Sequence, residues 1–222
     1  MTNSEIKANS SQKVINPGKI KSLLKPGEVG ATLEITVRDK DGKITDHRGP
    51  MRSKSFVRQF LDLLWIQSFP LGEPVAFNVR DITNVVRTIN FGSHIFGCDG
   101  GAGIVTLGII VGTGNTAPTI TDHVIETPIA HGVGAGQLQY GAVTYGAPAS
   151  DATTSQFTIT RDFANGSGGL ITINEIGLYV EGYDGAGAAI YDFMTIRDVI
   201  GGGVPVPNGQ TLTINYRPQA TV

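Results

Sequence analysis

From residue 74 to the C-terminus, short apolar runs alternate with glycine-rich turns, and this pattern constrains the fold more than any other feature. The turns have sequences such as CDGGAG (98–103), GTGNTAP (112–118), NGSGG (165–169) and PNG (207–209). The candidate strands between them are 74–78, 85–89, 104–111, 137–143, 157–163, 170–180, 189–200 and 211–216. Strands of this length and spacing predict a mainly β fold, a β-sandwich or barrel-like domain over 74–222.

Residues 31–73 have a different pattern. Leu33, Ile35 and Val37 alternate with polar residues before the turn DKDG (39–42), and Ile44 starts a return strand, which predicts a β-hairpin. A calcium loop would need further oxygen ligands after Asp39, at positions where the sequence has lysines.

The segment SKSFVRQFLDLLWIQSF (53–69) predicts one amphipathic helix, with Ser53 as its N-cap and Pro70 as its stop. Its apolar stripe fits a membrane surface or a partner groove, but a helix that closes one side of a β core needs the same stripe, so we expect packing on the core or on another subunit. We expect an assembly interface at four positions of this stripe: Phe56, Phe60, Leu64 and Trp65.

Residues 1–30 predict an extended N-terminal arm, because they are polar and lack a periodic apolar face. Charge is divided unevenly along the chain. Residues 1–60 hold 12 lysines and arginines against 6 acids, a balance of +6, and the remaining residues hold 5 against 13, a balance of −8. This division suits subunits that meet head to tail or an arm that binds an acidic neighbour, although a solvated basic tail has the same composition.

No pattern in the sequence indicates a cofactor, a metal or a catalytic group. Cys98 is the only cysteine, the glycines of 112–118 lack a P-loop ending, and His123 and His131 do not have zinc-ligand spacing. No apolar run reaches the length of a membrane span and the first residues lack an apolar signal core, so we expect synthesis and retention in a cytoplasm.

Glu175 is the one residue that raises the question of catalysis, because it is an acid within the apolar strand LITINEIGLYV (170–180). A buried carboxylate with a raised pKa can act as a general acid or base. The alternative is a structural ion pair, for which Arg161 and Arg197 on flanking strands are the candidate partners. No nucleophile or second acid accompanies Glu175, so we expect the structural role.

Three segments in order, LGIIVGTGNTAPTITDHVIETPI (107–129), FTITRDFANGSGGLITINEIGLYV (157–180) and AIYDFMTIRDVI (189–200), carry a resemblance. Over about residues 104–217 the chain resembles the N-terminal β domain of tail-collar fibre proteins of tailed bacteriophages. The resemblance implies that the EIGLY strand is structural. Fibres of that family continue into a repetitive shaft, whereas this sequence stops at Val222, so we expect something other than a complete long fibre.

The resemblance implies a non-enzymatic structural protein of a tailed-phage virion, in the neck, collar or tail, that forms an oligomeric ring or a docking platform for fibres. A capsid-decorating or head-fibre protein is an alternative, and a carbohydrate-binding β-sandwich protein is a third. The expected partners are further copies of the chain and other virion proteins. We favour protein over nucleic acid as the partner of the basic arm, because its lysines are scattered and no aromatic residues lie between them.

Overall fold

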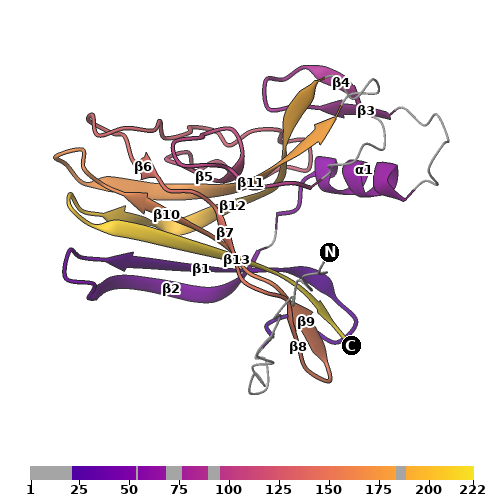
Figure 1. Cartoon of the computed structure of the whole chain (residues 1–222), viewed down its shortest axis with the longest axis horizontal. Helices are drawn as coiled ribbons and strands as arrows, with labels where there is room; N and C mark the ends of the chain where they lie inside the picture. Colours follow the sequence, from indigo (N-terminus) through magenta and orange to yellow (C-terminus); the bar gives the residue numbers. More distant parts are fainter. Residues whose placement is uncertain (1–21, 54, 69–76, 90–95, 184–188) are drawn as a thin grey trace, which may run out of the picture.

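The computed structural model describes residues 22–53, 55–68, 77–89, 96–183 and 189–222. The described chain is mainly β with one helix, as expected from the sequence (Figure 1). Its elements are β1 (Val29–Arg38), β2 (Ile44–Ser53), α1 (Arg58–Gln67), β3 (Phe77–Arg80), β4 (Val86–Ile89), β5 (Gly108–Gly112), β6 (Gln139–Tyr140), β7 (Thr144–Tyr145), β8 (Ala149–Ser150), β9 (Thr154–Gln156), β10 (Ile159–Ala164), β11 (Ile171–Tyr183), β12 (Ile190–Val206) and β13 (Thr211–Thr221).

Two sheets form the body of the molecule. The larger has the order β2-β1-β13-β10-β6, with β7, β8 and β9 joined to it, and the smaller has the order β12-β11-β5. Side chains cross between the two sheets: the hydroxyl of Tyr216 on β13 donates to the carboxylate of Asp198 on β12, at 2.9 Å. The sheets therefore pack face to face as a sandwich, and β3 and β4 form a separate hairpin.

The hairpin β1–β2 belongs to the larger sheet. β1 pairs with β13 in antiparallel register along its whole length, from Val29 opposite Ala220 to Arg38 opposite Thr211. The turn at 39–42 is as predicted, with the Asp39 carboxylate accepting from the amides of Asp41 and Lys43. The domain boundary expected near residue 73 lies outside the described residues, and one continuous sheet contains strands from both sides of it.

The core is built from alternating positions of the strands. On β1, Leu33, Ile35 and Val37 are buried and face Leu212 and Ile214 of β13 and the smaller sheet beyond. Burying an aliphatic side chain of this size contributes about 1.5 to 3 kcal/mol.

The expected helix start at Ser53 is wrong. β2 continues to Ser53, whose hydroxyl donates to Asp198 at 2.7 Å, and α1 begins only at Arg58. Phe56 instead forms a β-bridge with Ile196 at the edge of β12. Pairing with that sheet edge holds the backbone before residue 58 extended, so the apolar stripe alone was a poor guide to the helix boundary.

The sequence predicted that a strand ends at residue 200, before the run GGG (201–203), but β12 continues through this run. β11 and β12 pair over nearly their whole lengths, but β12 has several extra residues between Val199 and Val204, which lie opposite Glu175 and Ile173. Gly202 and Gly203 have positive φ values of 77° and 58° within this bulge. Glycine tolerates that conformation, so the strand continues to Val206.

Candidate assembly site

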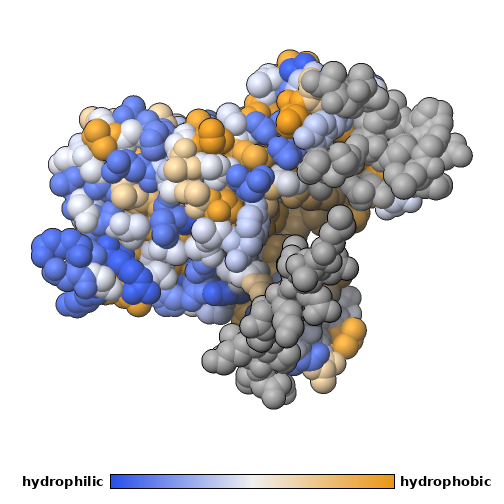
Figure 2. Space-filling view, viewed as in Figure 1, coloured by the Kyte–Doolittle hydropathy of each residue, from blue (hydrophilic) through white to orange (hydrophobic). Residues whose placement is uncertain are grey.

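An apolar groove of about 760 Å³ lies between α1 and the end of the larger sheet. Phe56, Phe60 and Leu64 line it on one side, and Phe157, Pro218 and Ala220 line it on the other. Figure 2 shows hydrophobic residues in the hollow between the part that holds α1 and the part that holds β8 and β9. We call this feature the assembly groove.

Three of the four residues predicted as an assembly interface line the assembly groove. The ring centroids of Phe56 and Phe60 are 4.7 Å apart, and Phe60 is 5.9 Å from Phe96, which also lines the groove. Trp65, the fourth predicted residue, is not among the lining residues. Its ring lies 5.0 Å from that of Phe77 on β3.

Large apolar side chains are exposed on both walls of the groove. Leu64 is 44% exposed, Phe157 39% and Val29 80%. A single exposed apolar residue is ordinary on a protein surface, but a set gathered in one hollow is typical of a contact surface. None of these three side chains belongs to the hydrophobic core of the sandwich.

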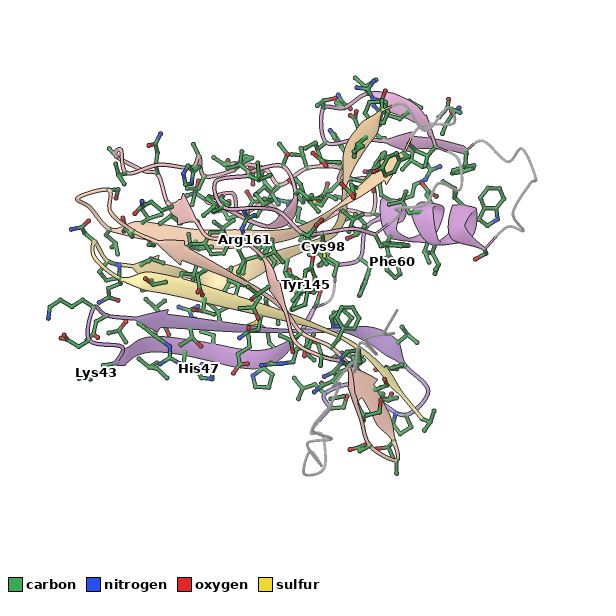
Figure 3. The ribbon with its side chains drawn as sticks, in the orientation of Figure 1. Lys43, His47, Phe60, Cys98, Tyr145 and Arg161 are labelled. Carbon is green, nitrogen blue, oxygen red and sulfur yellow. The ribbon has the colours of Figure 1, made fainter. Side chains whose placement is uncertain are left out.

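Cys98 and Tyr145 meet in the groove, as Figure 3 shows. The Sγ atom of Cys98 and the hydroxyl of Tyr145 are 3.5 Å apart. Burial raises the pKa of the Cys98 thiol, and burial, Cys98 and the nearby carboxylates of Asp99 and Glu181 raise the pKa of Tyr145. Both groups therefore stay protonated at neutral pH.

Glu175 lies on β11, opposite Gly112 of β5 and Val199 of β12, and is completely buried. Its Oε1 accepts hydrogen bonds from the amides of Gly114 and Thr127, at 3.1 and 2.7 Å. Its Oε2 accepts from the amide of Glu126 at 2.9 Å and from Nε of Arg197 at 3.1 Å. Four donors thus surround both oxygens, an arrangement that satisfies a carboxylate anion.

Arg197, not Arg161, is the partner of Glu175. Its Nη1 donates to Asp122 at 2.6 Å, and its Nη2 donates to the carbonyl and hydroxyl oxygens of Thr116, at 3.3 and 3.2 Å. Burial alone would lower the pKa of Arg197, but the bonds to Asp122 and Glu175 raise it. The guanidinium therefore remains charged.

This network fixes the long loop 113–128 to the smaller sheet. Glu126 accepts from the amides of Asn115 and Thr116 at 2.9 and 3.0 Å, which closes the loop on itself. Gly114 is needed for the close approach, because a Cβ there would lie 2.5 Å from the Oε1 of Glu175. The amide that a phosphate loop would offer to a ligand is therefore bonded to Glu175.

Arg161 has a different structural task. It is fully buried on β10, and its guanidinium makes five hydrogen bonds of 2.6 to 3.0 Å to backbone carbonyls. The acceptors are the carbonyls of Gly101, Ile104, Leu107, Ile109 and Gly141. The side chain thus holds the segment 101–109 against the sandwich, with the ring of Tyr140 at 4.9 Å. Burial lowers the pKa of Arg161 to about 10.

One of the two histidines considered as metal ligands, His131, makes a structural contact: its Nδ1 accepts from the amide of Tyr140 at 3.1 Å. The nearby carboxylate of Asp122 binds Arg197. Within the described ranges, no group of three or more His, Cys, Asp or Glu side chains is placed to hold a metal ion. Nor does any helix in that part of the chain combine the length and apolar character needed to cross a lipid bilayer.

Sequence reasoning missed several members of these sites. Asp122 and Glu126 lie in a loop whose path the sequence does not define, and Phe96, Cys98 and Tyr145 reach the groove from segments without a shared periodicity. Comparison of the chain with protein-family models, curated proteins and solved structures finds no match. The function proposed next therefore rests on the geometry and on the resemblance in sequence.

Proposed function

We propose that this chain is a non-enzymatic structural protein of a tailed-phage virion, in the neck, collar or tail. It forms an oligomeric ring or a docking platform for fibres, and the assembly groove is its contact surface. The observation that carries the proposal is the groove itself: an open apolar hollow of about 760 Å³ between α1 and the larger sheet. The sequence resemblance to tail-collar fibre proteins supplies the setting in a virion.

The surroundings of Glu175 support a structural task over a catalytic one. Its oxygens accept four hydrogen bonds, its exposed fraction is 0%, and its charged partner Arg197 is also buried. A general acid or base needs contact with a substrate or with a water molecule that reaches it. The same network makes a rigid loop, which suits a protein that serves as a scaffold.

Two matched variants on α1 test the proposal. Leu64 is 44% exposed and lines the groove, whereas Leu61 is 63% exposed and is not among its lining residues. Glutamine is a good helix former, so Leu64→Gln and Leu61→Gln place the same polar amide on the same helix. We expect Leu64→Gln to weaken self-association about 5- to 160-fold, because an amide in an apolar contact costs about 1 to 3 kcal/mol. Leu61→Gln should leave self-association unchanged.

Sedimentation velocity and native mass, measured from micromolar to near-millimolar chain, give the readout. Imaging of the assembled fraction distinguishes rings from other forms. A wild-type chain that stays monomeric over this range, alone and with other virion proteins, would overturn the proposal. Equal effects of the two leucine variants would show that another surface makes the contact.

A further inference from the structure

The assembly groove is apolar and acidic, and these two properties together define its occupant. Among the described residues that line it, the charged side chains are Asp99 and Glu181, and no lysine or arginine is present. The negative charges of both carboxylates raise the pKa of the Tyr145 hydroxyl, which also lies in the groove. A segment that carries apolar side chains and positive charge is complementary to such a surface.

The first 21 residues of the chain have this composition. They contain four lysines and one glutamate, a balance of +3, together with several aliphatic side chains. The lysines are Lys7, Lys13, Lys19 and Lys21, and the aliphatic residues are Ile6, Val14, Ile15 and Ile20. Extended, 21 residues span up to about 70 Å, which is enough to reach a neighbouring molecule.

The chain leaves the sheet on the face opposite to the groove. The hydroxyl of Ser22 donates to the side chain of Gln219 at 3.1 Å. A Cβ atom at Gly30 would lie 3.3 Å from the side chain of Leu24. Gly30 and Gln219 are partners across β1 and β13. Because side chains alternate along a strand, the side chains of Val29, Ala31, Pro218 and Ala220 point to the other face of the sheet. These four residues line the groove, which Gly30 and Gln219 also border. Residues 22–24 therefore cover the outer face of the sheet.

We propose that the segment 1–21 of a second copy of the chain binds in the assembly groove. The inference rests on the proposed function, since it names the partner for the same surface. A contact between the arm of one copy and the groove of the next joins two different surfaces, so it repeats head to tail and closes as a ring or continues as a filament. It also accounts for the opposite charge balances of the two parts of the sequence.

Cysteine cross-linking in the full-length chain tests the contact. Cys98 is replaced by alanine in every variant, so that only the introduced thiols react. One chain carries Asn16→Cys in the arm, and a second carries Ser155→Cys, which is exposed on the groove wall. A third carries Lys43→Cys at the tip of the β1–β2 hairpin, at the other end of the molecule from the groove (Figure 3).

Mixing the Asn16→Cys and Ser155→Cys chains under mild oxidation should give a disulfide-linked heterodimer, resolved by mass under non-reducing conditions. The Asn16→Cys and Lys43→Cys pair should give at least ten times less. A chain with both Asn16→Cys and Ser155→Cys should form linked oligomers. If that double variant closes on itself as a monomer, the arm occupies its own groove and the inference is wrong.

Charge complementarity is tested by replacing Lys13, Lys19 and Lys21 with glutamine, one at a time, in the Asn16→Cys chain. Each replacement should lower the yield of the heterodimer about 1.5- to 5-fold, as expected for a solvent-exposed ion pair. A chain that self-associates normally but gives no cross-link from Asn16 to Ser155 would overturn this inference and leave the proposed function standing. A chain that does not self-associate at all would overturn both.

Discussion

Nε of Arg197 donates a hydrogen bond of 3.1 Å to the Oε2 of Glu175, and both side chains are buried, with exposed fractions of 3% and 0%. β11 and β12 thus share one ion pair, and each partner reaches out to the loop 113–128. Removing a partner from such a pair leaves buried donors without acceptors, which costs far more than the pair itself contributes. This asymmetry allows the role of Glu175 to be measured.

Glu175→Ala should lower the free energy of unfolding by about 3 to 5 kcal/mol, because it removes the acceptor of four donors, two of them buried and two part-buried. Glu175→Gln keeps the shape of the side chain but places its NH2 group against N–H donors. We therefore expect a smaller loss of unfolding free energy, about 1 to 3 kcal/mol. Denaturant unfolding followed by circular dichroism measures both. Two variants as stable as the wild type would contradict the structural role, as would a folded glutamine variant that has lost a hydrolytic activity present in the wild type.

Gly114→Ala should destabilise the protein by about 1 to 3 kcal/mol, because the new methyl group would lie 2.5 Å from both Oε1 of Glu175 and Cβ of Glu126. Gly201→Ala is the matched control, since a Cβ at that position meets nothing within 4 Å. Thermal unfolding of both variants gives the comparison. A Gly114→Ala protein that unfolds together with the control would show that the loop can move aside.

Arg161→Met should lower the free energy of unfolding by at least about 3 kcal/mol, because it leaves five backbone carbonyls, one buried and four part-buried, without their charged donor. Hydrogen exchange should accelerate first in the segment 101–109. Arg217→Lys is the comparison: Arg217 pairs with Glu34 at a partly exposed site, and a change of less than about 1 kcal/mol is expected. Unchanged exchange in 101–109 would contradict the holding role of Arg161.

Stability should fall as the pH rises above about 10. Burial raises the pKa of Tyr140, Tyr179 and Tyr216 above the ordinary value for a phenol. Above pH 10 the unfolded chain loses these protons and the folded chain keeps them. Each tyrosine therefore lowers the free energy of unfolding by about 1.4 kcal/mol per pH unit, until the pH reaches the pKa of that tyrosine in the folded state.

Arg161 contributes stability that increases with pH in this range, because its pKa is lowered to about 10 in the folded state. It is one group against the three buried tyrosines and Tyr145, so the net stability still falls. Tyrosinate absorbance recorded with the unfolding curve provides the check. The three buried phenols should ionise only when the protein unfolds, and free titration of all six tyrosines in the folded state near pH 10 would contradict the prediction.

Local patterns in the sequence predicted the β class, the hairpin with its turn at 39–42, the existence of one helix and the strand that contains Glu175. Each depends on neighbours within a few residues. The choice between Arg161 and Arg197 could not be made in this way, because it depends on which sheet each strand joins. β12 pairs with the strand of Glu175, whereas β10 joins β13 in the other sheet.

The start of the helix and the full lining of the groove could not be predicted either, because both depend on contacts between residues that are distant in sequence. Phe56 and Phe60 fit one helical stripe, but a β-bridge to Ile196 holds Phe56 outside the helix. The opposite wall of the groove comes from Phe157, Pro218 and other residues that are distant in sequence. Only the packed tertiary structure brings the two walls together.

The pairing of β1 with β13 ties the order of synthesis to the order of folding. β1 leaves the ribosome before the other strands that the structure describes, yet it pairs along its whole length with β13, the last of them. Contacts so distant along the chain form slowly, and until β13 emerges β2 is the one partner of β1 among the described strands. A nascent chain halted before residue 211 therefore exposes the core face of β1, together with an open strand edge, to every other unfinished copy nearby.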